Sequence, residues 1–362
     1  MSEGSGYLKY AYRRHFRKSV LLTVIILVLT AVTVIVSISI AQYPIGFTEA
    51  YLILADHING KIPAAPPAGS YPDWLKHHIV WNMNLPRAIG GMAVGAILGL
   101  GGAVMQSIIK NPLADPYTTG ISSGAMFGVT ICAILGISFV PIGNGDLAQI
   151  INAFVFALIP AAVIIFVSSF KKTSPTMMVL IGIGVMYIFT ASTTLLKFTA
   201  SPETIEEIYR WSVGSIGRIT WAALPFLLGA MAFIIAASMF LSNSINVLSS
   251  GDKSAMSLGV NPSRMRLICL VIVSVSTAAA VCFTGTIGFV GLVSPHIARM
   301  IVGSNIRYLA PCSAAVGGLM LLAADCIARN AGTTGLPVGV VTALAGSPLF
   351  LYFLIKQKKS AW

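Results

Sequence analysis

Residues that could carry out chemistry are few in this chain, and none of them forms a recognisable catalytic set. The Gly-x-x-x-x-Gly-Lys-Ser/Thr sequence is missing, and Gly60-Lys61 is followed by Ile-Pro. The chain therefore lacks the loop that cradles nucleotide phosphates in many ATP-binding proteins. We identify no nucleophile paired with a base and no deep group of metal ligands, so the sequence does not indicate an enzyme.

Two small groups of ionisable residues remain. His77 and His78 follow Asp73 and could together hold a metal ion, but metal ligation needs three or four convergent groups. A solvated outer loop is the simpler interpretation. Asp325 lies four residues before Arg329, a spacing that places both side chains on one face of a helix and predicts an ion pair. The apolar segments otherwise lack central acids and histidines, which argues against a proton or ion relay.

The composition of the chain indicates what kind of structure must position these residues. Hydrophobic residues make up 56% of the 362-residue chain and charged residues only 9%, whereas an average soluble domain has about 25% charged residues. Water could not solvate such a surface, which excludes a soluble enzyme and a disordered chain. Five cysteines lie scattered in apolar segments without paired spacing, so neither a disulfide framework nor a zinc site is indicated.

We predict an all-α fold class: a polytopic membrane protein with about ten transmembrane helices, since roughly 20 apolar residues cross a bilayer. The eighth segment is interrupted by Gly288, Gly291 and Pro295, which predicts a short or broken helix lined by protein. The ten segments lie near residues 19–41, 86–109, 117–136, 147–169, 177–200, 221–241, 266–284, 287–303, 308–327 and 337–355.

Basic residues orient the chain with both termini in the cytoplasm. If the N-terminus is inside, seven of the 23 lysines and arginines fall outside, and 23 minus seven leaves sixteen inside. This asymmetry is the one expected of a multi-pass protein of the cell membrane, so the net charge of +12 implies no nucleic-acid partner. The outer basic residues are Lys61, Lys76, Arg87, Lys197, Arg210, Arg218 and Arg329.

We expect residues 1–362 to form a single transmembrane domain with three notable stretches outside the spans. These are a cytoplasmic N-terminal segment at 1–18, a proline-rich outer loop at 42–85 and an inner loop at 242–265. We expect the outer loop to pack on the outer face of the protein without forming a domain of its own.

The inner loop contains a candidate helix. Its pattern is amphipathic from Gly251 to Leu258, with Ala255, Met256 and Leu258 as the apolar residues. Gly259 is a typical C-terminal stop for a helix. This short helix could lie along the membrane or against a partner chain.

The second span carries glycines at Gly91, Gly95 and Gly99, one every four residues. Such a ridge lets neighbouring helix backbones approach closely. We interpret this span as a central helix surrounded by others, in preference to a substrate path along the glycines.

Several motifs, in order along the chain, give it a family resemblance. They include Asn111-Pro-Leu-Ala-Asp-Pro116, Gly285-Thr-Ile-Gly-Phe-Val-Gly-Leu-Val-Ser-Pro-His-Ile-Ala-Arg299 and Leu336-Pro-Val-Gly-Val-Val-Thr-Ala-Leu-Ala-Gly-Ser-Pro-Leu-Phe350. Over residues 19 to 357 the chain resembles the FecCD family of ABC importer permeases, which includes permeases for iron–siderophore, haem and vitamin B12 uptake.

The resemblance implies a mode of action that composition alone could not. Family members have ten helices per subunit and form homodimers with a path along the two-fold axis. Each permease engages one ATP-binding-cassette ATPase subunit, which binds ATP and Mg, so no cofactor is expected in this chain. An extracytoplasmic substrate-binding protein delivers the cargo.

The resemblance also assigns residues to three roles. The segment that matches the cytoplasmic coupling helices, which dock on the ATPase, contains Gly251, Asp252, Ala255, Leu258 and Gly259. Arg87 and Arg329 match outer-face arginines that can pair with glutamates of the binding protein. For each, the alternative is a side chain that faces lipid headgroups or pairs within the subunit, as Arg329 could with Asp325. Some relatives have a further arginine three residues before Arg87, where this chain has Asn84.

The third assigned role is an inner gate. Ser174 and Thr176 match a region that narrows the path in some family members, while a helix N-cap accounts for Ser174 equally well.

The function implied is the permease subunit of an ATP-driven importer for a metal chelate, with a ferric siderophore or haem as the favoured cargo. Cobalamin and molybdate or tungstate are the alternative cargos within that class. An ion-gradient-driven secondary carrier is the alternative from another class. It would need a coupling-ion site near the middle of the membrane, usually in broken helices, and the broken eighth segment contains no acid.

Overall fold

The computed structural model describes residues 2–66, 69–140, 145–170, 174–332 and 335–356, and every regular element in these ranges is helical. The order along the chain is α1 (Ser2–Ser39), α2 (Phe47–Ile58), α3 (Tyr71–His78), η1 (Ile79–Asn84), α4 (Leu85–Ile109), η2 (Pro116–Thr119), α5 (Ile121–Leu135), α6 (Asp146–Phe170), α7 (Pro175–Lys197), α8 (Pro202–Ser212), η3 (Ile216–Arg218), α9 (Leu224–Phe240), α10 (Ser242–Ser249), α11 (Asp252–Ser257), α12 (Pro262–Thr284), α13 (Val290–Val302), α14 (Ile306–Asn330) and α15 (Val338–Lys356).

The all-α membrane fold predicted from composition is confirmed. Six helices in the described ranges are long and apolar enough to cross a membrane. A seventh candidate is the pair α9 and α10, which bends by 62° at its break, and three shorter apolar helices lie in α5, α13 and α15. Each of the ten predicted segments coincides with one of these helices.

The outer segment 42–85 is more ordered than a proline-rich loop would suggest. It contains α2 and α3, and α3 continues through the π-helical turn η1 into α4. In this turn the N–H of Leu85 donates to the carbonyl of Val80, five residues earlier. Pro86 explains the wider turn, because proline has no N–H and its ring crowds the carbonyl four residues before it.

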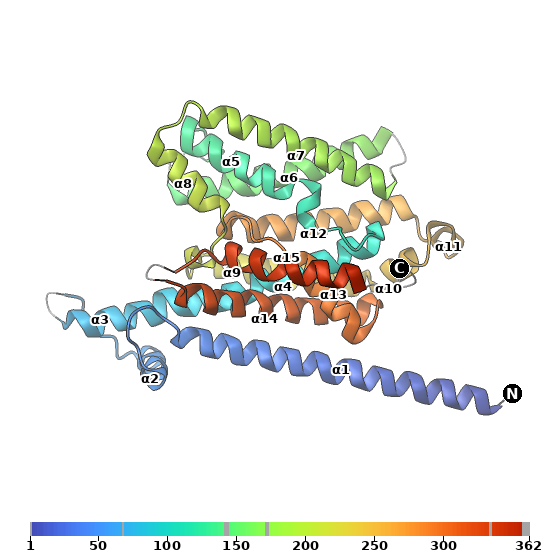
Figure 1. The fold of residues 1–362 in the computed structure, drawn as a ribbon, viewed down its shortest axis with the longest axis horizontal. Helices are drawn as coiled ribbons and strands as arrows, with labels where there is room; N and C mark the ends of the chain where they lie inside the picture. The colour runs from blue at the N-terminus through green and yellow to red at the C-terminus, as the bar shows by residue number, and fades with distance from the viewer. Residues whose placement is uncertain (1, 67–68, 141–144, 171–173, 333–334, 357–362) are drawn as a thin grey trace.

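The helices surround α4, which is buried over nearly all of its length. It packs on α9, α12, α13 and α14, while α5, α6 and α7 form a separate flank and α1 lies on α14 at the opposite side (Figure 1). The described chain begins and ends at one end of the bundle, where α11 also lies (Figure 1). We call this the inner end and the opposite one, which carries α2, α3 and α8, the outer end.

Glycines allow α4 and α14 to touch through their backbones. A Cβ added at Gly95 would lie 2.3 Å from the carbonyl oxygen of Gly317, and one added at Gly99 would lie 2.4 Å from that of Ser313. No side chain fits at such distances. The predicted central helix is therefore confirmed, and its glycine ridge serves close helix packing.

The eighth segment is a short helix, as predicted. Residues 285–289 are not helical, Phe289 has a positive φ of 69°, and α13 begins at Val290. This irregular stretch lies inside the protein, because a Cβ added at Gly285 would lie 2.1 Å from the carbonyl oxygen of Trp211, and Ile287 is fully buried. Irregular backbone at membrane depth is tolerated where protein covers it.

The glycine contact gives a first prediction. Gly95→Ala should destabilise the protein by about 1–3 kcal/mol or more, because one added methyl group must push two backbones apart. Thermal unfolding in detergent measures the effect. Gly229→Ala in α9 is the matched control, since nothing lies within 4 Å of its added Cβ. Equal midpoints for the two variants would show that the α4–α14 contact is not tight.

Candidate functional site

The predicted inner helix is present as α11, Asp252–Ser257, between two glycines with positive φ. Gly251 has a φ of 128° and Gly259 a φ of 80°, so glycine is suited to both ends. Ala255 is buried against the protein, whereas Met256 and Leu258 are 59% and 68% exposed. Two large apolar side chains therefore stand free at the inner end of the bundle.

A buried arginine holds α11 in place. Asp252 accepts hydrogen bonds from Nη1 and Nη2 of Arg266 at 3.0 and 2.6 Å. The Nε of Arg266 donates to the carbonyl oxygen of Ile108 at 3.0 Å, in the last turn of α4. Arg266 is only 2% exposed, and Lys110 adds a longer ion pair to Asp252 at 3.6 Å. The start of α11 is thus tied to both α12 and α4.

This anchor gives Asp252 a structural contact, while its coupling assignment stays a prediction. The hydrogen bonds from Arg266 lower the pKa of the Asp252 carboxyl, so the pair stays charged at neutral pH. Removing the carboxylate would leave a buried guanidinium without its counter-charge, which is costly. Asp252 is therefore unsuitable as a surface contact to be mutated without harm, and Leu258 is the better probe of this helix.

The start of α7 faces α11 across a groove of about 700 Å³. Ser174 and Pro175 line one side, and residues of α11, the following loop and the start of α12 line the other. The hydroxyl of Ser174 accepts a hydrogen bond from the N–H of Met177 at 3.2 Å, so Ser174 is the N-cap of α7. Thr176 is exposed in the first turn. The helix-cap alternative accounts for Ser174, and the gate assignment stays a prediction.

At the outer end, two arginines share one buried carboxylate. Asp325 is fully buried in α14. It accepts hydrogen bonds from Nε of Arg87 at 3.1 Å and from Nε of Arg329 at 2.7 Å. The predicted ion pair between Asp325 and Arg329 is confirmed, and Arg87 from α4 joins it. This pairing places Asp325 in a structural contact.

Arg329 is engaged inside the protein. It is 6% exposed, and its Nη1 donates to the carbonyl oxygens of Ser37 and Ile40 at 3.0 and 2.9 Å. Asn84 binds the same region, donating to the carbonyl oxygen of Ile38 at 2.9 Å. These contacts satisfy the last carbonyls of α1, which a helix end leaves without partners. The docking assignment stays a prediction for both arginines, of which Arg87 is the more accessible, with its side chain 21% exposed.

The outer histidines do not gather into a metal site. His77 lies beside His57, with ring centroids 5.2 Å apart, while His78 stacks on Trp74. Within the described part of the chain, no three His, Cys, Asp or Glu side chains are grouped closely enough to hold a metal ion. The simpler interpretation of a solvated loop was wrong in its structure, because His77 and His78 lie half-buried on the helix α3.

The stretch at 111–116 connects α4 to η2 and α5. Asp115 is the N-cap of η2 and accepts from the N–H of Tyr117 at 2.9 Å. The hydroxyl of Tyr117 accepts from the N–H of Ile287 at 3.3 Å, in the irregular stretch before α13. A Cβ at Gly291 would lie 3.0 Å from a carboxylate oxygen of Asp115. The turn thus fastens the second and third spans to the broken eighth.

These features define a class of protein: a helical membrane bundle with a small helix presented at its inner end and no phosphate-binding loop of its own. The FecCD transport family model matches residues 25–356. The chain therefore belongs to the FecCD transport family.

Similarity to known permeases extends over most of the chain. It is 34% identical to the permease protein of an iron(3+)-hydroxamate import system of Bacillus subtilis, covering 80% of this chain and 74% of that one. It is 40% identical to the permease protein of a cobalamin import system of Halobacterium salinarum, covering 76% and 73%. A solved inward-facing structure, assigned to a metal-chelate type ABC transporter, superposes with a TM-score of 0.78 at 28% identity, covering 93% of this chain and 99% of that one.

The anchor under α11 gives a second prediction. Arg266→Met should loosen the start of α11, because Asp252 and the Ile108 carbonyl lose their shared donor. We expect a local cost of about 1–3 kcal/mol, seen as roughly five- to hundredfold faster amide exchange over residues 252–257. Arg264→Met is the control, since Arg264 is exposed two residues away. Unchanged exchange in both variants would refute the anchoring role.

Proposed function

We propose that this chain is the permease subunit of an ATP-binding-cassette importer that carries a metal chelate across the cytoplasmic membrane. The observation that carries this proposal is α11, which presents Met256 and Leu258 to solvent while Asp252 is tied to α12 and α4. A helix that is both exposed and firmly anchored is suited to transmit a conformational change of an ATPase to the rest of the bundle.

A ferric siderophore or haem is the cargo we favour. Family membership supports transport of chelates of this size, and one similar permease serves iron(3+)-hydroxamate import. Another similar permease serves cobalamin import, so cobalamin remains an alternative, with molybdate or tungstate as a further one. The cargo should be selected mainly by an extracytoplasmic binding protein, because the permease then needs to offer only a path.

We further propose a homodimer, with the cargo path between the two copies. The free face of α7 supports this proposal, since Leu180, Tyr187, Ile188 and Leu195 are each more than 60% exposed. Exposed apolar faces of this kind mark contacts with lipid or with another helix. Nucleotide and Mg would be bound by the partner ATPase, whose cycle would shift the dimer between outward-open and inward-open states.

A secondary carrier is the less favoured function. It would need an ion site near the middle of the membrane. The broken segment around α13 contains no Asp or Glu, and the buried Asp325 is already paired with two arginines. These facts favour a transporter powered by a separate subunit.

The decisive experiment reconstitutes the permease in liposomes with its ATPase and binding protein. Leu258→Asp should lower ATP-driven uptake and ligand-stimulated hydrolysis about tenfold, because a charge replaces an apolar contact at the docking surface. Leu258→Met keeps an apolar side chain and should retain both uptake and stimulated hydrolysis near the wild-type levels. Thermal unfolding of each variant reports whether the fold is intact.

Two results would contradict the proposal. One is full stimulation of hydrolysis in Leu258→Asp, which would remove α11 from the coupling role. The other is uptake driven by an ion gradient in liposomes that contain this chain alone, which would identify a secondary carrier.

Docking of the binding protein gives a separate prediction. Arg87→Gln should weaken its association with the permease up to about fivefold at low salt, and the wild-type affinity should fall as salt is added. Arg307→Gln is the control, because Arg307 is exposed at the inner end. Reversing the charge of Arg329 is a poor test, since it would place a second carboxylate beside the buried Asp325. Equal, salt-independent affinities would contradict docking through Arg87.

A further inference from the structure

A large cavity opens on the flank of the bundle, away from α11. Its volume is about 1030 Å³. Residues of α6 form one wall, and Phe226 of α9 with residues just before that helix forms the other. Residues of α12 form the floor, and residues of α8 and η3 lie at one end. Both walls pack on α12, so the cavity is a crevice between neighbouring helices.

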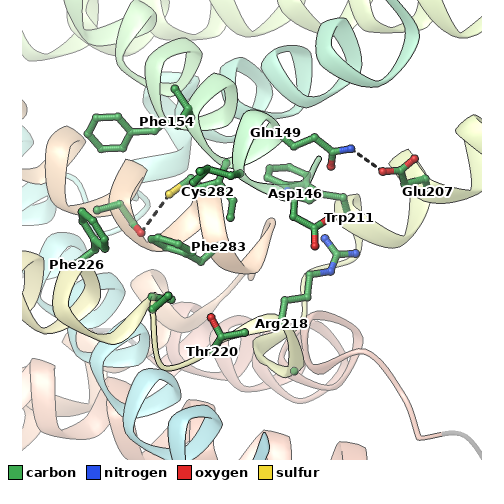
Figure 2. A pocket seen from close by; sticks show the side chains of 17 residues that line it. Asp146, Gln149, Phe154, Glu207, Trp211, Arg218, Thr220, Phe226, Cys282 and Phe283 are labelled. Atoms are coloured by element: carbon green, nitrogen blue, oxygen red, sulfur yellow. Dashed lines mark hydrogen bonds between the residues drawn. The ribbon is translucent and has the colours of Figure 1, made fainter. Parts of the chain in front are cut away.

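The two ends of this crevice differ in chemistry. Asp146, Glu207 and Arg218 gather at one end, while Phe154, Phe226 and other apolar side chains line the opposite end (Figure 2). Asp146 and Phe154 are eight residues apart on α6, which is about 12 Å along a helix. The crevice therefore reaches from the outer ends of the helices well into the apolar part of the bundle.

The apolar end offers little to a polar ligand. Besides the aromatic side chains, the lining there includes Ala279 and Cys282. The Cys282 thiol donates to the carbonyl oxygen of Ala279 at 3.4 Å, so this polar atom is already used within α12. This end is also accessible from outside the bundle, since Phe226 is 67% exposed. Such a surface suits a hydrocarbon chain entering from the bilayer.

The charged end carries both signs. Partial desolvation lowers the pKa of the Arg218 guanidinium, and the nearby carboxylates of Asp146 and Glu207 act in the opposite direction. One oxygen of Glu207 accepts a hydrogen bond from Gln149 at 2.6 Å, which orients that carboxylate at the mouth. One cation beside two carboxylates complements a headgroup that itself bears an anion and a cation.

We propose that this crevice binds a glycerophospholipid of the outer leaflet whose headgroup bears a primary ammonium. Its phosphate pairs with Arg218 and its ammonium with Asp146 and Glu207, while an acyl chain fills the crevice between α6, α9 and α12. A guanidinium is suited to phosphate, and each methylene removed from water adds to the affinity. None of the proposed coupling and docking residues lines the crevice, although Arg87 approaches Gly217 at its edge, so the proposal does not rest on the transport function.

Brominated lipids test the proposal, because bromine quenches a tryptophan that it contacts. Trp211 lines the crevice and is 4% exposed. The protein is placed in nanodiscs of phosphatidylethanolamine brominated on its acyl chains, and Trp211→Phe identifies the contribution of this tryptophan. We expect quenching of Trp211, and an apparent affinity about fivefold lower in Arg218→Glu.

Matched variants separate binding from folding. Lys61→Glu is the charge control, because Lys61 is exposed in the outer segment and does not line the crevice. Ala222→Phe should block the crevice from an exposed position, and mass spectrometry of the purified protein should then detect less retained phospholipid. A thermal midpoint equal to that of the wild type shows that a variant is folded.

Three outcomes would overturn the proposal. Quenching and lipid retention could be the same in Arg218→Glu, Ala222→Phe and the wild type. Phosphatidylglycerol could bind better than phosphatidylethanolamine, which would exclude the ammonium contact. A ferric siderophore could displace the lipid in competition, which would identify the crevice as part of the cargo path.

Discussion

The backbone contact between α4 and α14 is the constraint on which the rest of the structure depends. Two helices can meet this closely only where glycine faces carbonyl, as at Gly95 and Gly317. The hydrophobic effect does not favour helix association in lipid, so close van der Waals packing must stabilise the contact. Once α4 is held at the centre, α9, α12 and α13 can pack around it. The outer arginine cluster lies at one end of α4, and α11 lies at the other.

Charged residues in this apolar protein serve mainly as fasteners at helix ends. At the outer end, Asp325 accepts hydrogen bonds from Arg87 and Arg329. Arg329 also donates to a carbonyl oxygen in the last turn of α1. At the inner end, Arg266 connects the last turn of α4 with Asp252 at the start of α11. In both clusters a buried guanidinium finds several oxygen partners, which offsets the cost of removing the charge from water. Helix ends thereby keep their positions without large loops.

Local patterns predicted the features that depend on neighbours along the chain. Ten apolar runs gave the helices, Gly259 marked the end of α11, and the spacing of Asp325 and Arg329 gave their ion pair. Contacts between distant segments were not predictable in this way. Arg87 is 238 residues from Asp325, and Arg266 was only one of many inner basic residues, at the first position of its predicted span. The crevice beside α12 depends on three helices at once, which no pattern within one segment reports.

The π turn before Pro86 has a geometric consequence for the outer end. It adds one residue to a helix that otherwise runs from Tyr71 to Ile109. One extra residue corresponds to about 100° of rotation about the helix axis, since an α-helix has 3.6 residues per turn. The turn thus sets the azimuth of α3 relative to α4. It determines which side chains of α3 point toward α2 and which point away, independently of the glycine contact between α4 and α14.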